Sequence, residues 1–238
     1  MTLPALIDYR RFEALTFDCY GTLIDWEAGL TAAFRPILAA HGIEHDEEAV
    51  LQRYAGYEAA AEAGPYRRYR DVLADGLRGV LRESGAEPTS AEEAAFAGSV
   101  VEWPAFPDSG AALAALKTRF HLGVITNCDD DLFAASNDRL GVEFDWVVTA
   151  QQVGCYKPDE ANFHAAFERL GLPRERILHV AQSLFHDHVP AGRLGLTSVW
   201  IDRRHDRPGA GATPPVEGAH PAATYPDMAS FAAAATAI

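Results

Sequence analysis

The sequence predicts an α/β protein with a Rossmann-like parallel sheet core, flanked by helices, and an inserted α-helical cap subdomain. Two patterns predict this fold. From about residue 103 onward, short apolar runs alternate with stretches of helical periodicity, which is typical of a parallel sheet with right-handed crossovers. Between residues 26 and about 100 only helical periodicity is present. We therefore expect a core formed by residues 1–24 and 103–238 and a cap formed by residues 25–102.

The first strand of the expected core ends at a single carboxylate. Residues 14–23 read ALTFDCYGTL, so an apolar run stops at Asp18 and is followed by a glycine turn and the hydroxyl of Thr22. In open parallel sheets, ligands bind just beyond the carboxyl ends of the strands. Asp18 should therefore face a cleft, and it is our candidate nucleophile.

The helical insertion divides at its glycines and prolines. Breaks at Gly42, at Gly64-Pro65 and at residues 85–88 predict about four helices. The prolines within residues 103–107 fix the backbone and predict a stiff, non-helical linker back to the core. Two of the helices have clear apolar faces, formed by Leu30, Phe34, Ile37 and Leu38 and by Val72, Leu73, Leu77, Val80 and Leu81.

The rest of the core is expected to alternate between strands and helices. The predicted elements are a strand at His121–Thr126, a helix near 130–140, a strand at Trp146–Thr149, a helix near 159–170, a strand at Ile177–Ala181, a helix near 186–194 and a strand at Thr197–Ile201. Residues 205–221 are rich in Gly and Pro and predict a surface loop. The alanine-rich segment from Pro226 onward predicts a terminal helix.

Composition and charge limit the classes of function. The chain has 238 residues and a formal net charge of −14, which argues against nucleic acid, because phosphate backbones are bound through accumulated lysine and arginine. No apolar run approaches the ~18 residues needed to cross a bilayer, and the N-terminus shows no signal-peptide pattern. Three cysteines without metal-ligand spacing suit a reducing compartment. We therefore expect a cytoplasmic protein without nucleic-acid or membrane partners.

Three further motifs fall where this scheme places strand ends. Thr126-Asn127 directly follows one strand, Lys157-Pro158-Asp159 stands just before an expected helix, and residues 179–187 read HVAQSLFHD. Together with Asp18, these segments resemble the four ordered motifs of the haloacid dehalogenase superfamily of hydrolases. The resemblance spans almost the whole chain.

Tyr20 separates two chemistries of that superfamily. Its phosphatase members usually carry a second aspartate at this position, because phosphate ester hydrolysis must protonate a departing alkoxide and needs a divalent cation to offset the phosphoryl charge. A phenol with a reference pKa of about 10 is a poor general acid at neutral pH, whereas a halide leaves without a proton or a metal. Gln182 aligns with a magnesium-binding aspartate of metal-dependent relatives and is neutral. Both residues favour carbon–halogen cleavage.

The resemblance is therefore to the 2-haloacid dehalogenase branch, and it implies a role for each motif residue. Asp18 would attack the carbon that bears the halogen, and water would hydrolyse the resulting aspartyl ester. Lys157 would lie beside Asp18 and favour its ionised form, while Asp187 would fix Lys157 and orient the water. Arg53 would be the cap arginine that holds the halide and the carboxylate. The other residues expected to bind substrate are Tyr20, Thr22, Thr126, Asn127, Gln182, Ser183 and Phe185.

We expect a small anionic substrate, no cofactor and no bound metal, and a homodimer is compatible with this interpretation. Two alternatives stay open. The first is a phosphatase-type member with an altered metal site. The second is a hydrolase-like protein that acts on another small electrophile or is not catalytic. Gln182 and Leu184 replace small polar residues of the best-known dehalogenases, so the sequence leaves the substrate, the halogen and the stereochemistry undetermined.

Overall fold

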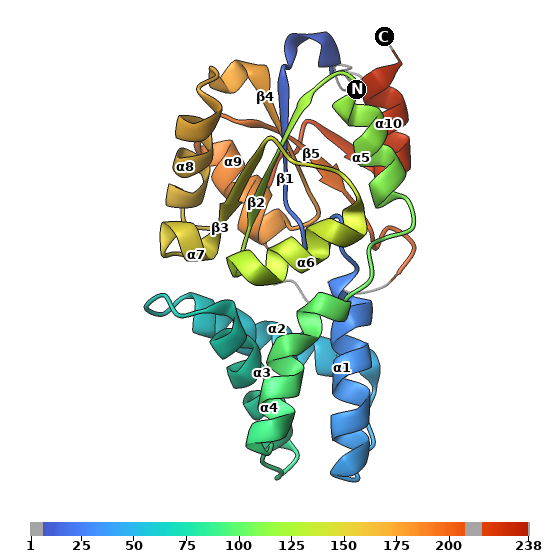
Figure 1. Cartoon of the computed structure of the whole chain (residues 1–238), viewed down its shortest axis with the longest axis vertical. Helices are drawn as coiled ribbons and strands as arrows, with labels where there is room; N and C mark the ends of the chain where they lie inside the picture. Colours follow the sequence, from blue (N-terminus) through green and yellow to red (C-terminus); the bar gives the residue numbers. More distant parts are fainter. Residues whose placement is uncertain (1–6, 208–215, 238) are drawn as a thin grey trace.

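Six parallel strands form the central sheet within residues 7–207 and 216–237, the part of the chain that the computed structural model describes (Figure 1). In spatial order they are β3 (Trp146–Thr149), β2 (His121–Thr126), β1 (Ala14–Phe17), β4 (Ile177–Ala181), β5 (Thr197–Ile201) and β6 (Ala223–Tyr225). In doubly wound sheets with this strand order, ligands bind where the order reverses, which here is between β1 and β4. The predicted α/β fold class is confirmed.

The central strand β1 brings the sequence motifs to one edge of the sheet. Phe17 is in register with Val124 of β2 on one side and with Val180 of β4 on the other. All four residues of β1 are buried, as expected for a strand covered on both faces. Because the three strands are parallel, Asp18 and the residues that follow β2 and β4 all meet beyond the same carboxyl edge.

Helices cover both faces of the sheet (Figure 1). One face carries α5 (Ser109–Lys117), α6 (Asp130–Leu140) and α10 (Met228–Thr236), and the other carries α8 (Ala161–Leu170) and α9 (Val189–Arg193), with the short α7 (Ala150–Val153) after β3. Side chains along β1 point alternately to the two faces of the sheet. Leu15 and Phe17 join the larger apolar core with residues of α5 and α10, while Ala14 packs with residues of α8 and α9.

Four helices between β1 and β2 form a bundle beyond the carboxyl edge of the sheet (Figure 1). They are α1 (Trp26–Ala40), α2 (Glu47–Glu62), α3 (Tyr69–Glu83) and α4 (Ser90–Gly98), followed by a 3₁₀ turn at Ser99–Glu102. Three of the helices begin at a side-chain cap. Asp25 accepts a hydrogen bond from Ala28 N, Asp46 accepts one from Ala49 N, and Thr89 forms a reciprocal capping box with Glu92.

The two segments that connect this cap to the core, one before α1 and one after the 3₁₀ turn, run side by side. Asp25 N donates to Pro104 O at 2.8 Å, and Phe106 N donates to Leu23 O at 3.0 Å. Trp103 is buried against α1 at Gly29, where a Cβ atom would lie only 2.3 Å from the indole ring. The linker is therefore non-helical, as predicted, and it is fixed to the first segment by backbone hydrogen bonds.

Several elements differ from the sequence-based expectation. The helix expected near 186–194 is a π-helical turn at Leu184–His188 followed by α9, and β6, α5 and α7 are additional elements. Within the loop predicted for 205–221, residues 208–215 lie outside the described part of the chain, and the remaining ones contain no helix or strand. The terminal helix is present as α10. None of the described helices is both long enough and apolar enough to cross a membrane.

Candidate active site

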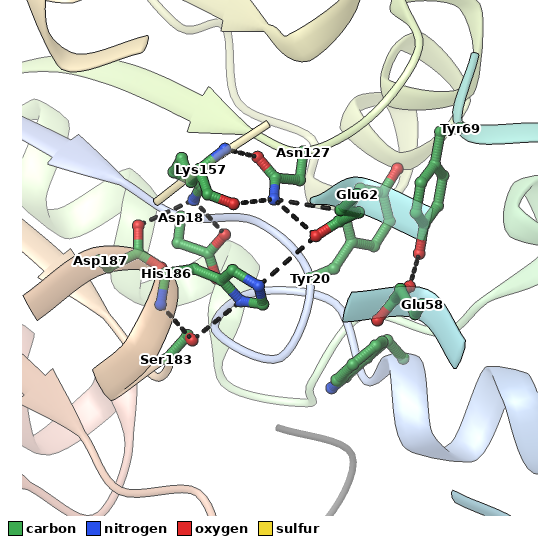
Figure 2. Close-up of a pocket in the computed structure, with 11 residues that line it drawn as sticks. Asp18, Tyr20, Glu58, Glu62, Tyr69, Asn127, Lys157, Ser183, His186 and Asp187 are labelled. Atoms are coloured by element: carbon green, nitrogen blue, oxygen red, sulfur yellow. Dashed lines mark hydrogen bonds and ion pairs between the residues drawn. The ribbon is translucent and has the colours of Figure 1, made fainter. Parts of the chain in front are cut away.

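The ammonium group of Lys157 links the two buried carboxylates at the carboxyl edge of the sheet (Figure 2). Its Nζ donates to Asp18 Oδ1 at 2.9 Å, to Asp187 Oδ1 at 2.8 Å and to the carbonyl oxygen of Ile125 at 2.9 Å. An ammonium has three N–H donors, so these bonds use all of them. The structure therefore brings together the three residues expected to be catalytic.

Asn127 holds the backbone of the loop that carries Lys157. Its Oδ1 accepts from Lys157 N at 2.7 Å, and its Nδ2 donates to Lys157 O at 3.0 Å. Thr126 ends β2 beside it and is buried, and its Oγ1 has no hydrogen-bond partner among the described residues. Asn127 lines the pocket in front of Asp18, but both its amide oxygen and its amide nitrogen are hydrogen-bonded to the backbone of Lys157.

The second oxygen of Asp18 is held by Thr22. Thr22 Oγ1 donates to Asp18 Oδ2 at 2.6 Å and accepts from Gln182 N at 2.8 Å. Gly21 forms the tight turn between the two residues with a φ of 91°, a backbone conformation that glycine adopts at no steric cost. Both oxygens of the candidate nucleophile are therefore oriented by neighbouring donors.

Asp187 is positioned from behind by a histidine that the sequence interpretation missed. His179 Nε2 lies 3.0 Å from Asp187 Oδ1, and His179 Nδ1 lies 3.0 Å from Thr16 Oγ1. The other oxygen of Asp187, Oδ2, is buried without a hydrogen-bond partner among the described residues. A polar residue within the buried strand β4 is the sequence signal that could have revealed His179, because such residues must find partners.

Burial and mutual charge set the protonation of this group. Burial raises the pKa of Asp18, while the Lys157 ammonium and the Thr22 hydroxyl act in the opposite direction. Burial disfavours the charged form of Lys157, but the adjacent carboxylates outweigh it and raise the lysine pKa. Burial also opposes ionisation of Asp187, yet Lys157 and His179 hold its pKa below the usual range. Lys157 is thus cationic and Asp187 anionic at neutral pH.

The cap closes the site with residues that the sequence interpretation did not include. Trp26 of α1, Glu58 and Glu62 of α2, and Tyr69 of α3 line the pocket in front of Asp18, together with core residues that include His186 (Figure 2). The cavity in this pocket has a volume of about 40 Å³, which is room for a few water molecules. Glu58 and Glu62 stand four positions apart, so the helical period places them on one face.

Glu62 connects the cap to the core across the edge of the pocket. Asn127 Nδ2 lies 3.4 Å from each carboxylate oxygen of Glu62, and His186 Nε2 lies 3.5 Å from Glu62 Oε2. Burial disfavours the charged imidazole, but Glu62 outweighs it and the pKa of His186 is raised. His186 is also held by Ser183, whose Oγ lies 3.1 Å from Nδ1.

Other predicted substrate-binding residues are dispersed around the site. Tyr20 and Ser183 line the pocket, but the Tyr20 hydroxyl lies 2.9 Å from Ser136 Oγ. Phe185 lines a neighbouring cavity that shares Glu62, Lys157 and His186 with the first. Gln182 lines a third cavity together with Gly21 and does not line the pocket in front of Asp18, although its backbone N–H donates to Thr22 Oγ1.

The expectation for Arg53 is wrong. Its side chain is 45% exposed and pairs with Glu83 of α3 at 3.4 Å, and it does not line the pocket. The physical reason is helical geometry. Five residues at 3.6 per turn rotate by about 140°, so a helix that turns Glu58 toward the pocket turns Arg53 away. Among the described pocket-lining residues none is an arginine.

The residues at the site do not fit a magnesium ion. Lys157 occupies the space between the two carboxylates that face each other, and Tyr20 directs its hydroxyl toward Ser136. Within the described residues, no group of three or more His, Cys, Asp or Glu side chains is arranged to hold a metal. Magnesium prefers several carboxylate oxygens and bound waters in octahedral geometry, and here one oxygen of each of the two aspartates is already bonded to the Lys157 ammonium.

Comparison with known proteins agrees with this fold. A family model described as haloacid dehalogenase-like hydrolase matches residues 12–183. The (S)-2-haloacid dehalogenase of Pseudomonas fluorescens is 24% identical over 203 residues, which cover 82% of this chain and 87% of that protein. The phosphoserine phosphatase of Thermus thermophilus is 32% identical over 173 residues, or 69% of this chain and 67% of that one.

Among solved structures, a defluorinating L-2-haloacid dehalogenase superposes with a TM-score of 0.77 at 25% identity, covering 93% of this chain and 94% of the other. The family model spans most of the core and the whole cap, from the start of β1 to the segment after β4. The chain belongs to the haloacid dehalogenase-like hydrolases.

Proposed function

We propose that this hydrolase removes the halogen from a small 2-haloacid, without a metal, through an ester formed on Asp18. The observation that carries the proposal is the environment of Asp18: a lysine and a threonine orient its oxygens, and neither Tyr20 nor Gln182 supplies the further carboxylate that metal-assisted phosphoryl transfer needs. The names of several relatives, (S)-2-haloacid dehalogenases among them, support the same substrate class.

The first step is a displacement at carbon. An Asp18 carboxylate oxygen forms a bond to the carbon that bears the halogen, and the carbon–halogen bond breaks with its electron pair leaving on the halide. No proton is transferred in this step, so no general acid is required. Lys157 and Thr22 fix the plane of the carboxylate, and such positioning lowers the barrier because reactive geometry is reached before bonds change.

The second step releases the product. Water attacks the Asp18 carbonyl carbon, and the bond from this carbon to the ester oxygen breaks. One proton of the water passes to the departing oxygen, which gives the 2-hydroxyacid, and the other is released as the Asp18 carboxylate forms again. Asp187 Oδ2 is a buried acceptor in the pocket lining without a hydrogen-bond partner among the described residues, so it orients this water. Over the whole cycle, one water and one organic halide give one alcohol, one halide ion and one proton.

The experiment that tests the proposal follows the oxygen atoms. A single turnover in ¹⁸O-labelled water with enzyme in excess should place the label in Asp18 and leave the first product unlabelled, because the oxygen transferred to carbon comes from the aspartate. Halide release from chloro-, bromo- and fluoroacids should persist in EDTA. Label in the first product, or halide release that stops in EDTA and returns with magnesium, would contradict the proposal.

Phosphate ester hydrolysis is the second candidate, and the similarity to the Thermus thermophilus phosphoserine phosphatase favours it. Magnesium-dependent turnover of p-nitrophenyl phosphate would single it out. A protein that acts on another electrophile, or on none, would show no Asp18 adduct by mass spectrometry with any halogenated acid.

A further inference from the structure

Glu58 is a buried acid on the cap side of the pocket, and two tyrosines hold one of its oxygens. Tyr54 donates to Glu58 Oε1 at 2.9 Å and Tyr69 donates to the same oxygen at 2.8 Å. Glu58 is 5% exposed and lines the pocket in front of Asp18 (Figure 2). Its Oε2 takes part in none of the hydrogen bonds found among the described residues. One carboxyl oxygen is thus anchored and the other is left for a ligand.

The two tyrosines are themselves fixed by packing. Tyr54 lies against α3 at Gly76, where a Cβ atom would come within 2.5 Å of the ring, and it contacts Phe34 and Phe96 edge-on or tilted. Tyr69 N donates to Asp129 Oδ1 at 3.2 Å. Since the tyrosine hydroxyls cannot move far, the direction of the Glu58 carboxyl group is set before a ligand arrives.

The surroundings of Glu58 favour its neutral form. Burial and the nearby Glu62 raise the pKa of Glu58 to about 8, against the smaller opposing effects of Tyr69, Tyr54 and His186. Glu62 itself is paired with His186 and Asn127. At neutral pH Glu58 is therefore mainly a carboxylic acid, which has one O–H donor.

The cations that line the pocket are already paired with its own acids, so an anionic substrate gains from a further donor. All three N–H groups of Lys157 are bound to protein oxygens, and Arg53 lies outside the pocket. His186 Nδ1 is hydrogen-bonded to Ser183, and Nε2 forms an ion pair with Glu62 at 3.5 Å but no hydrogen bond among the described residues. A substrate carboxylate beside Asp18 would otherwise face two carboxylates, Asp18 and Asp187, whose charge the single ammonium of Lys157 offsets only in part.

We propose that Glu58 is the specificity-determining residue of the cap, and that its Oε2 hydroxyl donates a hydrogen bond to the carboxylate of the substrate in place of an arginine. The identity of this anion rests on the proposed 2-haloacid function. An O–H···O⁻ bond of this kind is charge-assisted and stronger than a bond between neutral groups. It also requires no additional cation in a pocket where Lys157 and His186 are already paired with acids.

The test measures binding of propionate, which has the carboxylate of the substrate class but no leaving group. Calorimetry from pH 6 to pH 9 compares the wild-type protein with Glu58→Gln, Glu58→Ala and the control Glu47→Gln, which makes the same change at an exposed position of α2. Wild type and Glu47→Gln should lose affinity above about pH 8, approaching tenfold per pH unit, as the donor proton is lost.

Glu58→Gln should bind propionate within a few fold of wild type at pH 6–7 and keep that affinity to pH 9, because its amide donates without titrating. Glu58→Ala should bind at least tenfold more weakly at pH 7. If the propionate affinity of Glu58→Gln still falls with pH, the titrating group is His186 and the proposal is overturned. The proposal is also overturned if propylamine binds more tightly as the pH rises and this binding depends on Glu58.

The two proposals fail in different ways. If the affinity for propionate and its pH dependence do not change when Glu58 is replaced, the role of Glu58 is overturned even if halide is released. If no halide is released but propionate binding still depends on Glu58 and on pH as expected, the dehalogenase proposal is overturned and Glu58 remains a carboxylate-binding residue.

Discussion

The ammonium of Lys157 lies 2.9 Å from Asp18 Oδ1, although 139 positions separate the two residues in the chain. Lys157 reaches this position by extending past the end of β2, where it also donates to the carbonyl oxygen of Ile125. Asn127, directly after that strand, bonds to both the N–H and the carbonyl of Lys157. The charge that faces the candidate nucleophile is therefore held by the sheet edge itself.

Replacement of Lys157 by methionine should lower kcat/KM by several hundredfold. Two opposite charges a few ångströms apart interact by about 4 kcal/mol at an effective dielectric of ~20, and each ~1.4 kcal/mol is worth tenfold in rate. Lys117→Met is the matched control, because Lys117 is the only other lysine of the chain and lies on α5 away from the pocket. Steady-state kinetics on the best substrate decide this, and a Lys157→Met enzyme within tenfold of wild type would exclude the charge-balancing role.

Asp18→Asn should abolish turnover and leave the fold intact. The variant loses the anionic oxygen that attacks carbon, while Lys157 keeps its bonds to Asp187 and to Ile125 O. Halide release and the thermal unfolding midpoint should be measured together, with the exposed Asp138→Asn as control. An Asp18→Asn protein that retains substantial activity would remove Asp18 from the nucleophile role.

The acid limb of the pH–rate profile should lie above the ordinary pKa of an aspartate, which is about 4. Burial raises the pKa of Asp18, and only the ionised form attacks, so activity is present above the raised pKa and is lost as pH falls through it. Thr22→Val should move this limb to higher pH by about 1–2 units, because it deletes a hydrogen bond to the charged form worth about 1.5–3 kcal/mol.

The matched control for this shift is Thr118→Val, which removes an exposed threonine hydroxyl outside the pocket. The profile of kcat/KM between pH 3 and pH 8 is the measurement. A Thr22→Val limb that stays in place or moves to lower pH would show that Thr22 does not stabilise the ionised nucleophile.

Gly76→Ala should destabilise the protein by about 1–3 kcal/mol, because the new methyl group overlaps the ring of Tyr54 at 2.5 Å and the buried ring has no space to retreat. Gly56→Ala makes the same change on α2, where no atom lies within 4 Å. There it should stabilise by about 0.5–1 kcal/mol, since alanine is the better helix former. Equilibrium unfolding in urea gives both values, and equal effects at the two positions would contradict the packing described for Tyr54.

Local patterns in the sequence were sufficient for the core. Apolar runs bounded by polar residues located β1 to β5, and parallel strands necessarily place their carboxyl ends at one edge, so Asp18, Lys157 and Asp187 could be grouped without coordinates. The three-residue β6 and the π-helical turn at Leu184–His188 carry no comparable pattern. Both depend on the neighbouring elements against which they pack.

The cap side of the site was decided by tertiary packing. The periodicity of α2 fixes that Tyr54, Glu58 and Glu62 share one face, but it does not say whether that face meets solvent or the carboxyl edge of the sheet. Packing of α2 against α3 brings Tyr54 and Tyr69 to Glu58, and docking of α2 on the core pairs Glu62 with His186. The same docking turns Arg53 outward. The sequence by itself determined which residues could do chemistry at the sheet edge, and the packing of the cap decided which side chains the substrate meets there, because burial and charge depend on contacts between distant segments.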